Sequence, residues 1–275
     1  MQTIHLSDLS DRRLDAYCRL KDHQLRSAFE LEYALMVVES PFAVQVALES
    51  GLEPVSFLID ERHADSMAET LSVVPDDVPV FLAPRELMSE VVGFKVTRGV
   101  MGAFRRPQPE DPRSILANAH RVAVLEGLVD ASNVGAIFRS AAALGFDAVL
   151  LSPTCIDPYS RRAMRVSMGT VLKVPWAAFP STGDDAWPQG ACALLHDLGF
   201  HIVAMALDDN AISLDDPTLR DHKKLALFFG TEGWGLTKEA LQSCDEAVII
   251  PMSHGVDSLN VATSAAIAFW QLRQK

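Results

Sequence analysis

The sequence contains no apolar run approaching the roughly 18–20 residues that a membrane-spanning helix requires, so it does not encode an integral membrane protein of that kind. Its first residues, MQTIHLSDLSDRR, are polar and lack an apolar signal core, so we expect no secretion. Cysteine is scarce: four in 275 residues, with no CxxC pair, exclude a disulfide framework and give no sign of structural zinc. We therefore predict a cytoplasmic protein without a bound metal. The cysteines are Cys18, Cys155, Cys192 and Cys244.

Several catalytic signatures are also missing. The eight histidines form no HExxH motif and no local setting typical of a catalytic triad, so a hydrolase is not indicated. The dinucleotide fingerprint GxGxxG and the phosphate-loop pattern GxxxxGK[ST] are both absent. A dehydrogenase or another nucleotide-handling α/β enzyme is therefore a weaker interpretation.

Positive charge is in short supply, since 24 Lys and Arg residues face 36 Asp and Glu residues, for a net charge of −12. Over the roughly 12,000 Å² that such a chain exposes, this is about one negative charge per 1,000 Å². Local clusters reverse so dilute a background within a Debye length of about 8–10 Å. The balance excludes indiscriminate polyanion binding but leaves room for a specific RNA site. Basic residues cluster at Arg12, Arg13, Arg19, Lys21 and Arg26, at Arg105 and Arg106, and at Arg161, Arg162 and Arg165.

The chain is expected to form two domains. Its 49% hydrophobic and 22% charged residues are typical of a globular protein. Three prolines among polar residues between Arg105 and His120 predict a linker, because proline fixes φ and removes an amide donor. We predict an N-terminal domain over residues 1–105, a linker over 106–120 and a C-terminal domain over 121–275.

The first segment alternates short apolar runs with helical spacing, a pattern typical of a small α/β/α unit. We expect strands at Ala34–Val38, Val55–Ile59 and Val78–Leu82, with helices at Ala43–Leu48 and Ala64–Leu71. Nothing in this segment resembles a catalytic arrangement.

The second segment contains five near-continuous apolar strands separated by helix-length stretches. Strands that are apolar on both faces predict a mostly parallel sheet covered by helices. Ligands of such sheets bind beyond the carboxyl ends of the strands, where this segment collects its glycines and polar residues. The predicted strands are Val122–Val129, Ala148–Leu151, Ile202–Leu207, Leu225–Phe229 and Ala247–Ile250.

The loop after the first of these strands carries Asn133, Gly135 and Arg139. Asn133 tolerates turn conformations and can cap the following helix, while Gly135 allows close backbone approach. Arg139 is expected on the first turns of that helix. Its position near the carboxyl end of a strand favours a functional role over a buried salt bridge.

Two further loops follow later strands. One contains Gly230, Gly233 and Gly235 around Glu232, which by itself is typical of any glycine-rich turn. In the other, the strand stops at Pro251, and Ser258 and Asn260 precede a strongly apolar helix. We expect Ser258 to cap this helix and Asn260 to lie in its first turn, where its amide can reach a ligand.

Together, in this order and at these spacings, the three loops resemble the SpoU-type (TrmH-like) branch of the SPOUT RNA methyltransferases. The match covers the whole second segment. The first segment is similar to the ribosomal-protein-like substrate-binding domain of this family, around Val37-Val38-Glu39 and Thr97-Arg98-Gly99-Val100. The matching motifs are Asn133-x-Gly135-x-x-x-Arg139, Gly230-x-Glu232-Gly233-x-Gly235-Leu236, Ile250-Pro251-Met252 and Ser258-Leu259-Asn260-Val261.

The resemblance implies an α/β fold in which the C-terminal chain is threaded into a trefoil knot. It also implies a homodimer whose helices near the knot pack across a two-fold axis. The apolar helix expected at Val261–Trp270 is consistent with burial on more than one side, although full burial within one chain is the alternative.

The resemblance further implies S-adenosylmethionine as cofactor. By similarity, backbone groups around Gly230, Ile250 and Leu259 hold its adenosine and ribose, and Met252 forms a flexible wall. Glycine permits close backbone approach, and apolar side chains can flank an adenine without polar partners.

The implied reaction is methyl transfer to a ribose 2′-hydroxyl of RNA. The family's usual proposal makes the arginine matching Arg139 the base. Because a guanidinium has a pKa above about 12, we expect Arg139 chiefly to bind the phosphate beside the target ribose and to stabilise developing alkoxide charge. The other predicted catalytic residues orient Arg139 and the ribose. They are Asn133, Glu232, Ser258 and Asn260.

A second RNA contact is predicted at Arg161, Arg162 and Arg165, which follow Tyr159. Tyr159 can stack on a base while the arginines meet phosphates. A solvated helix face explains the same residues equally well.

Ribosomal RNA is the expected substrate, because the additional N-terminal domain resembles those of rRNA-modifying members. Transfer RNA is the alternative, and a self-protective antibiotic-resistance methylase uses the same architecture. A non-catalytic RNA-binding member of the fold is the remaining alternative, against which the intact motif residues argue.

Overall fold

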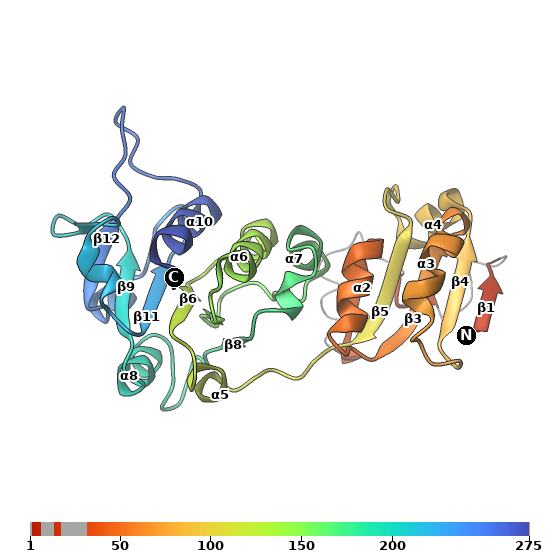
Figure 1. Cartoon of the computed structure of the whole chain (residues 1–275), viewed down its shortest axis with the longest axis horizontal. Helices are drawn as coiled ribbons and strands as arrows, with labels where there is room; N and C mark the ends of the chain where they lie inside the picture. Colours follow the sequence, from red (N-terminus) through yellow and green to blue (C-terminus); the bar gives the residue numbers. More distant parts are fainter. Residues whose placement is uncertain (1, 7–13, 18–31, 275) are drawn as a thin grey trace. The chain divides into compact units, whose positions relative to one another are not determined.

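The computed structural model describes residues 2–6, 14–17 and 32–274, so Cys18 and the basic residues from Arg12 to Arg26 lie outside the described residues. The chain divides into two compact units. The first contains Met1–Gln108 and Tyr159–Leu172, and the second contains Pro109–Pro158 and Lys173–Lys275 (Figure 1). The sequence-based boundaries did not anticipate that residues 159–172 pack with the N-terminal segment.

The first unit is built on a five-stranded mixed sheet in the order β1-β4-β3-β5-β2. Strands β1, β4 and β3 are parallel, and β5 runs antiparallel to both β3 and β2. The predicted strands and helices of this segment are present. The elements are β1 (Gln2–His5), β2 (Leu35–Glu39), α2 (Pro41–Glu49), β3 (Pro54–Asp60), η2 (Glu61–His63), α3 (Ala64–Leu71), β4 (Pro79–Ala83), α4 (Arg85–Val92), β5 (Val100–Arg105), α7 (Arg161–Val166) and η3 (Thr170–Leu172).

Local chemistry explains where these elements begin. Ser40 accepts a hydrogen bond from the amide of Ala43, and Pro41 occupies the first turn of α2. Met88 of α4 joins Leu58 and Phe81 in the core on one face of the sheet. Strands β1 and β5 escaped prediction, because Ile4 is the one strongly apolar residue of β1 and β5 is interrupted by Gly102.

The second unit contains a seven-stranded sheet in the order β10-β12-β9-β11-β6-β7-β8, in which every neighbouring pair is parallel. The predicted mostly parallel α/β architecture is confirmed. The two edge strands were not predicted, because two or three residues are too short to form a recognisable apolar run. The strands are β6 (Arg121–Leu125), β7 (Ala148–Leu151), β8 (Trp176–Ala178), β9 (His201–Met205), β10 (Ile212–Ser213), β11 (Leu225–Phe229) and β12 (Glu246–Ile249).

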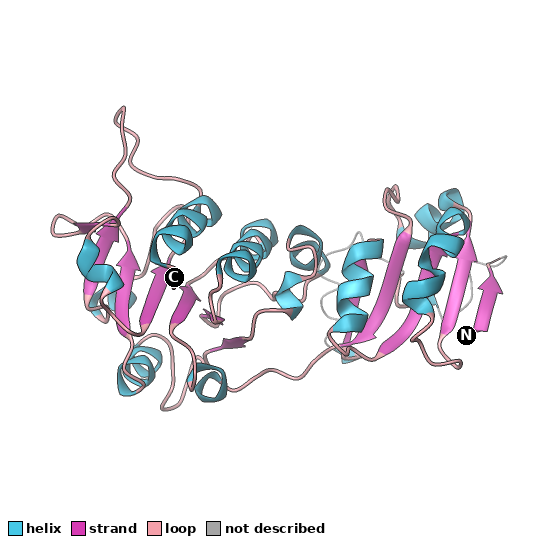
Figure 2. Ribbon diagram, viewed as in Figure 1, coloured by secondary structure: helices cyan, strands magenta, loops and turns pink. Residues whose placement is uncertain are grey.

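Helices cover both faces of this sheet (Figure 2). On one face, Leu116 and Leu195 pack with Phe228 of β11. On the other, Phe269 makes an edge-to-face contact with Phe229 and a tilted contact with Phe146. The helices are α5 (Pro112–Leu116), α6 (Ala131–Leu144), α8 (Gln189–Asp197), η4 (Pro217–Arg220), α9 (Lys238–Gln242) and α10 (Val261–Leu272), and α6 packs against α10.

The predicted linker is not wholly irregular. Pro112 stands in the first turn of α5, and the carboxylate of Asp111 accepts a hydrogen bond from the amide of Ser114. The proline that suggested a linker therefore starts a short helix, a position that suits its fixed φ and missing amide hydrogen. None of the described helices is long and apolar enough to cross a membrane.

Candidate active site

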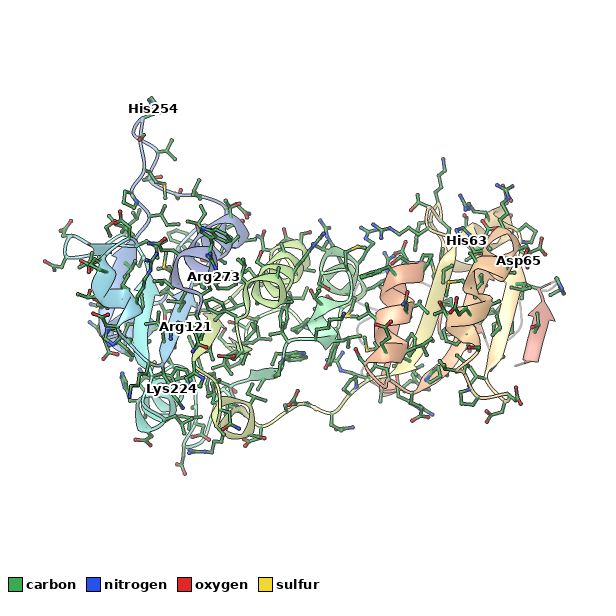
Figure 3. All side chains as sticks on the ribbon, viewed as in Figure 1. His63, Asp65, Arg121, Lys224, His254 and Arg273 are labelled. Carbon is green, nitrogen blue, oxygen red and sulfur yellow. The ribbon has the colours of Figure 1, made fainter. Side chains whose placement is uncertain are left out.

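A cavity of about 460 Å³ lies at the carboxyl ends of β9, β11 and β12. Its walls come from the ends of these strands, from the loop after β11 and from the loop between β12 and α10. The latter loop extends well beyond the sheet, with His254 at its tip (Figure 3). The cavity therefore forms where a parallel sheet is expected to bind its ligand.

All four predicted cofactor-binding residues line this cavity: Gly230, Ile250, Met252 and Leu259. Residue 230 has to be a glycine, because a Cβ atom at this position would overlap the backbone of Gly235 across the loop. Only glycine permits this close approach. The remaining three side chains give the wall an apolar character.

A cluster of three polar side chains joins helix α6 to the two later motif loops. The predicted capping role of Asn133 is wrong, because Asp130 is the N-cap of α6 and Asn133 lies in the first turn of the helix. Asn133 Nδ2 donates a hydrogen bond of 2.8 Å to Glu232 Oε1. Asn260 Nδ2 donates to the same oxygen at 2.5 Å and to Asn133 Oδ1 at 3.0 Å. Residues far apart in the sequence thus converge as predicted, and Glu232 also lines the cavity.

The predicted cap of the last helix is wrong. Helix α10 begins at Val261 and its N-cap is Asn260, whose Oδ1 accepts from the amides of Ala262 and Thr263 at 3.0 and 3.3 Å. The asparagine uses its oxygen for the helix and its amide hydrogens for the cluster, so one side chain serves both. Ser258 lines the cavity, and its hydroxyl donates to Asp257 Oδ1 at 3.2 Å.

Arg139 does not line the cavity of its own chain. It follows Asn133 on α6 at a spacing that turns it about 240° around the helix axis, so the two side chains leave the helix in different directions. Arg139 is exposed and makes no hydrogen bond or ion pair with the described part of the chain. The buried salt bridge considered as its alternative role is therefore absent.

The SpoU rRNA Methylase family model matches residues 120–270, which is more than half of the chain. The chain belongs to this family. The predicted resemblance to the SpoU-type methyltransferases is confirmed.

Curated relatives cover nearly the whole chain. An uncharacterised tRNA/rRNA methyltransferase, Mb0905, of Mycobacterium bovis is 39% identical over 265 residues, covering 96% of this chain and 89% of the relative. The 23S rRNA (guanosine(2553)-2′-O)-methyltransferase RlmP of Bacillus subtilis is 25% identical over 240 residues, covering 86% and 88%.

A solved structure shares the fold. The AdoMet-bound rRNA methyltransferase of Sinorhizobium meliloti superposes with a TM-score of 0.82 at 20% identity, and the alignment covers 99% of this chain and 98% of that one. At this identity the likeness establishes a common architecture.

Outside the cavity, the arginines that were predicted to contact RNA differ from one another in their surroundings. Arg161 Nη1 donates to Glu39 Oε2 at 2.8 Å, and its guanidinium lies 4.6 Å from the ring centre of Phe94. Glu39 is only 2% exposed, so Arg161 neutralises a buried carboxylate and holds α7 against β2. Arg165 approaches the same oxygen at 3.9 Å, but its side chain remains 42% exposed.

The predicted stacking of Tyr159 on an RNA base finds no support. Tyr159 is buried, and the guanidinium of Arg106 lies 5.0 Å from its ring centre. The ring face that the sequence offered to a base is thus occupied by an arginine of the same unit. The sequence around Tyr159 could not predict this contact, because Arg106 lies far from Tyr159 in the chain.

Two features near the cavity escaped the sequence analysis. Trp234, in the loop after β11, is 95% exposed. Glu126 follows β6 and is buried, and it accepts hydrogen bonds from Trp187 Nε1 and from both the amide and the hydroxyl of Thr237. A tryptophan in a glycine-rich turn is a signal that the motif comparison could have used.

At the amino ends of the strands, His201, His222 and Glu246 bring their ligand atoms within 4.8 Å of one another. The two imidazole rings are stacked, with centroids 3.7 Å apart and an interplanar angle of 4°. An ion bound by two imidazoles lies near both ring planes, which parallel stacked rings do not allow. His201 Nε2 instead pairs with Glu246 Oε1 at 2.7 Å. The expectation of no bound metal stays a prediction.

Proposed function

We propose that this chain transfers a methyl group from S-adenosylmethionine to a ribose 2′-hydroxyl of RNA, with ribosomal RNA as the substrate. The observation that carries the proposal is the Asn133–Glu232–Asn260 cluster at a cavity whose walls are the family's motif loops. Membership of the SpoU rRNA Methylase family supports the reaction class. The name of the RlmP relative, a 23S rRNA 2′-O-methyltransferase, supports the substrate.

The cavity fits the proposed cofactor. Its volume of about 460 Å³ lies within the roughly 300–1,000 Å³ typical of small-molecule sites. Gly230 allows the loop after β11 to fold closely against Gly235, and Ile250 and Leu259 supply apolar surface for an adenine. When bound, S-adenosylmethionine supplies a methyl group on a sulfonium that leaves as a neutral thioether.

The polar cluster orients the ribose hydroxyl. Both asparagine amides donate to Oε1 of Glu232, and no described residue donates to Oε2. Oε2 therefore accepts the hydrogen bond of the ribose 2′-hydroxyl, which fixes the direction of the hydroxyl lone pair, and it takes up the hydroxyl proton as the oxygen–methyl bond forms. Such alignment accounts for a large share of the acceleration in a transfer between two bound groups.

Arg139 is proposed to act across a dimer. Its guanidinium binds the phosphate beside the target ribose and stabilises developing alkoxide charge, since an arginine side chain offers hydrogen-bond donors and no acceptor. Because Arg139 does not line the cavity of its own chain, a second subunit has to bring it to the site. The face that supports such a dimer joins partly or fully exposed residues of α6 to exposed apolar residues of α10. It comprises Ser132, Ala136, Arg139 and Ala143 with Ile267 and Trp270.

The remaining expectations for the fold belong to the same proposal. A trefoil knot is supported by two motif loops that line one cavity before α10 returns to pack on α6. The lining residues are 230–236 of the first loop and Ile250, Met252, Asp257, Ser258 and Leu259 of the second. The first unit is proposed to bind the RNA substrate. A cytoplasmic location stays a prediction.

The decisive experiment measures transfer of a radiolabelled methyl group from S-adenosylmethionine to unmodified 23S rRNA and tRNA transcripts. Nuclease digestion is expected to release a 2′-O-methylated nucleoside from the 23S transcript. Label found only in tRNA would mean that tRNA, and not ribosomal RNA, is the substrate. Cofactor binding by calorimetry without any methyl transfer would favour the non-catalytic alternative. Mapping 2′-O-methyl sites in cells with and without the gene then separates housekeeping modification from self-protection.

The role of Arg139 is tested by single-turnover rates. Arg139→Ala is expected to lose transfer, and Arg139→Lys is expected to retain part of it because a lysine still meets a phosphate. Transfer by the alanine variant at the wild-type rate would end both the phosphate and the alkoxide roles.

A phosphate-binding role for α7 now rests on Arg162 and Arg165, since Arg161 is engaged by Glu39. Replacing both with glutamine is expected to flatten the salt dependence of RNA affinity. An unchanged slope would leave the solvated helix face as their explanation.

A further inference from the structure

The loop after β11 separates the cofactor cavity from a second cavity of about 460 Å³ in the same unit. Residues Thr231 and Trp234–Leu236 line both. We propose that the second cavity binds the base of the nucleotide whose ribose is methylated, an inference that rests on the proposed function. The other residues lining it are Glu126, Gly127, Pro153, Thr154, Ser181, Trp187 and Thr237.

The shared wall is a rigid hairpin that presents Trp234 to solvent. Thr231 and Gly235 exchange two backbone hydrogen bonds of 2.9 Å, and the amide of Trp234 donates to Thr231 Oγ1 at 3.1 Å. The indole is 95% exposed. An indole held on an ordered backbone, with its faces in water, is suited to stack on a nucleobase.

The opposite wall is preformed. Glu126 is 5% exposed, and its carboxylate receives Trp187 Nε1, the Thr237 amide and the Thr237 hydroxyl, each at 2.8 Å. These bonds tie the end of β6 to the end of the hairpin loop. Trp187 is fixed from behind by stacking on Phe228, with ring centres 5.6 Å apart. The cavity therefore needs no rearrangement to receive a flat ligand.

The chemistry of the lining selects a base over other parts of RNA. No lysine or arginine lines this cavity, and its one charged side chain is the carboxylate of Glu126, so a phosphate is disfavoured. Indole surfaces and the hydroxyls of Thr154 and Ser181 match a neutral planar heterocycle with polar edges.

The position of the cavity matches the proposed reaction. Glu232, which we assign to the ribose hydroxyl, lies on the same hairpin between Thr231 and Trp234 and faces the cofactor cavity. A nucleotide that places its base in the second cavity therefore has its ribose at the boundary with the methyl donor. One short loop separates the two ligands, so no large distortion of the RNA is required.

The test fills the second cavity without touching the first. Ser181→Phe places a ring in the cavity, and the matched control Thr182→Phe places the same ring on a neighbouring exposed residue that does not line it. With the 23S rRNA transcript, Ser181→Phe is expected to lower kcat/KM for methyl transfer at least 10-fold, while the Kd for S-adenosylmethionine by calorimetry stays within twofold. Equal activity of the two variants would overturn the proposal.

A cross-linking experiment tests the cavity without relying on turnover. The transcript is made with 4-thiouridine or 6-thioguanosine, irradiated with the full-length protein, and the attached peptides are identified by mass spectrometry. Cross-links to Trp234, Thr154 or Ser181 that disappear in Ser181→Phe support the base site even if no methyl group is transferred. Cross-links confined to other surfaces would overturn it, whether or not the transfer assay succeeds.

Discussion

The two ends of the seven-stranded sheet differ in what their polar side chains bond to. At the carboxyl ends, side chains from separate loops bond mainly to one another around two cavities, as in the Asn133–Glu232–Asn260 cluster. At the amino ends, charged side chains bond to backbone groups and join the strands to the last helix. The comparison teaches that this unit separates the surface it offers to ligands from the contacts that hold its last helix in place.

Arg121 is the central residue at the amino ends of the strands, which we call the closed end of the sheet. It lies with Lys224 at this edge in Figure 3 and is 5% exposed. Its Nε donates to the carbonyl of Leu272 at 2.8 Å, and its two terminal nitrogens donate to the carbonyls of Lys223 and His222 at 3.0 and 3.1 Å. One guanidinium thereby joins the first strand of the unit to the end of its last helix.

The largest effect is expected at the carboxyl end. Glu232→Gln keeps an oxygen for the two asparagine amides but replaces Oε2 with an N–H donor, so it cannot accept from the ribose. We expect single-turnover methyl transfer to fall about 100-fold, equivalent to about 2.7 kcal/mol, with little change in Tm. Glu239→Gln, on the exposed surface of α9, is the control. A Glu232 variant as active as this control would remove the carboxylate from the mechanism.

The next effect is expected at the amino end. Arg121→Met leaves the carbonyl of the buried Leu272 and the part-buried carbonyls of His222 and Lys223 without this donor, and should lower the free energy of unfolding by about 2 kcal/mol in urea titration. Arg113→Met, which removes a half-exposed pair with Asp185, should cost much less. Equal losses would mean that the closed end contributes no more than an ordinary surface pair.

A smaller, pH-dependent effect is expected from His222. Burial lowers its pKa, with a further contribution from neighbouring His201, opposed by Glu246 and Asp221. The unfolded chain therefore binds this proton more tightly, so stability is greatest above about pH 6.5 and declines as the pH falls below it. Thermal unfolding of His222→Gln should show a weaker acid decline than wild type. The control is His254→Gln at the loop tip; the same weakening there would contradict the assignment.

The smallest expected effect is a difference in alkylation rate between two cysteines, which compares local opening at the two ends of the sheet. Burial raises the pKa of Cys155, near the carboxyl ends, and raises the pKa of Cys244, just before β12, to about 12. Alkylation at pH 8, followed by mass spectrometry, should be slow at both in the folded protein and faster at Cys155. Faster labelling of Cys244 would show that the amino end is the one that opens.

Much of this unit could be predicted from sequence because its signals are local. The strands at β7 and β11 match their apolar runs, and the glycine at position 230 is required by the backbone of Gly235 in the same loop. Other assignments failed where a distant residue decided the outcome. Tyr159 was expected to meet RNA, yet Arg106 covers its ring. Ser258 was expected to cap α10, but Asn260 also has partners on two other loops and takes that place.

The order of apolar runs and motif residues was by itself sufficient to determine a parallel α/β sheet, its family and the polar residues at its ligand-binding edge. Only the tertiary structure decided which side chains share an oxygen, that Arg139 does not line the cavity of its own chain, and that a second cavity adjoins the first. The reason is physical: the hydrophobic period of an element is written in its own residues, whereas a hydrogen bond or a cavity wall depends on groups that folding brings together from distant parts of the chain.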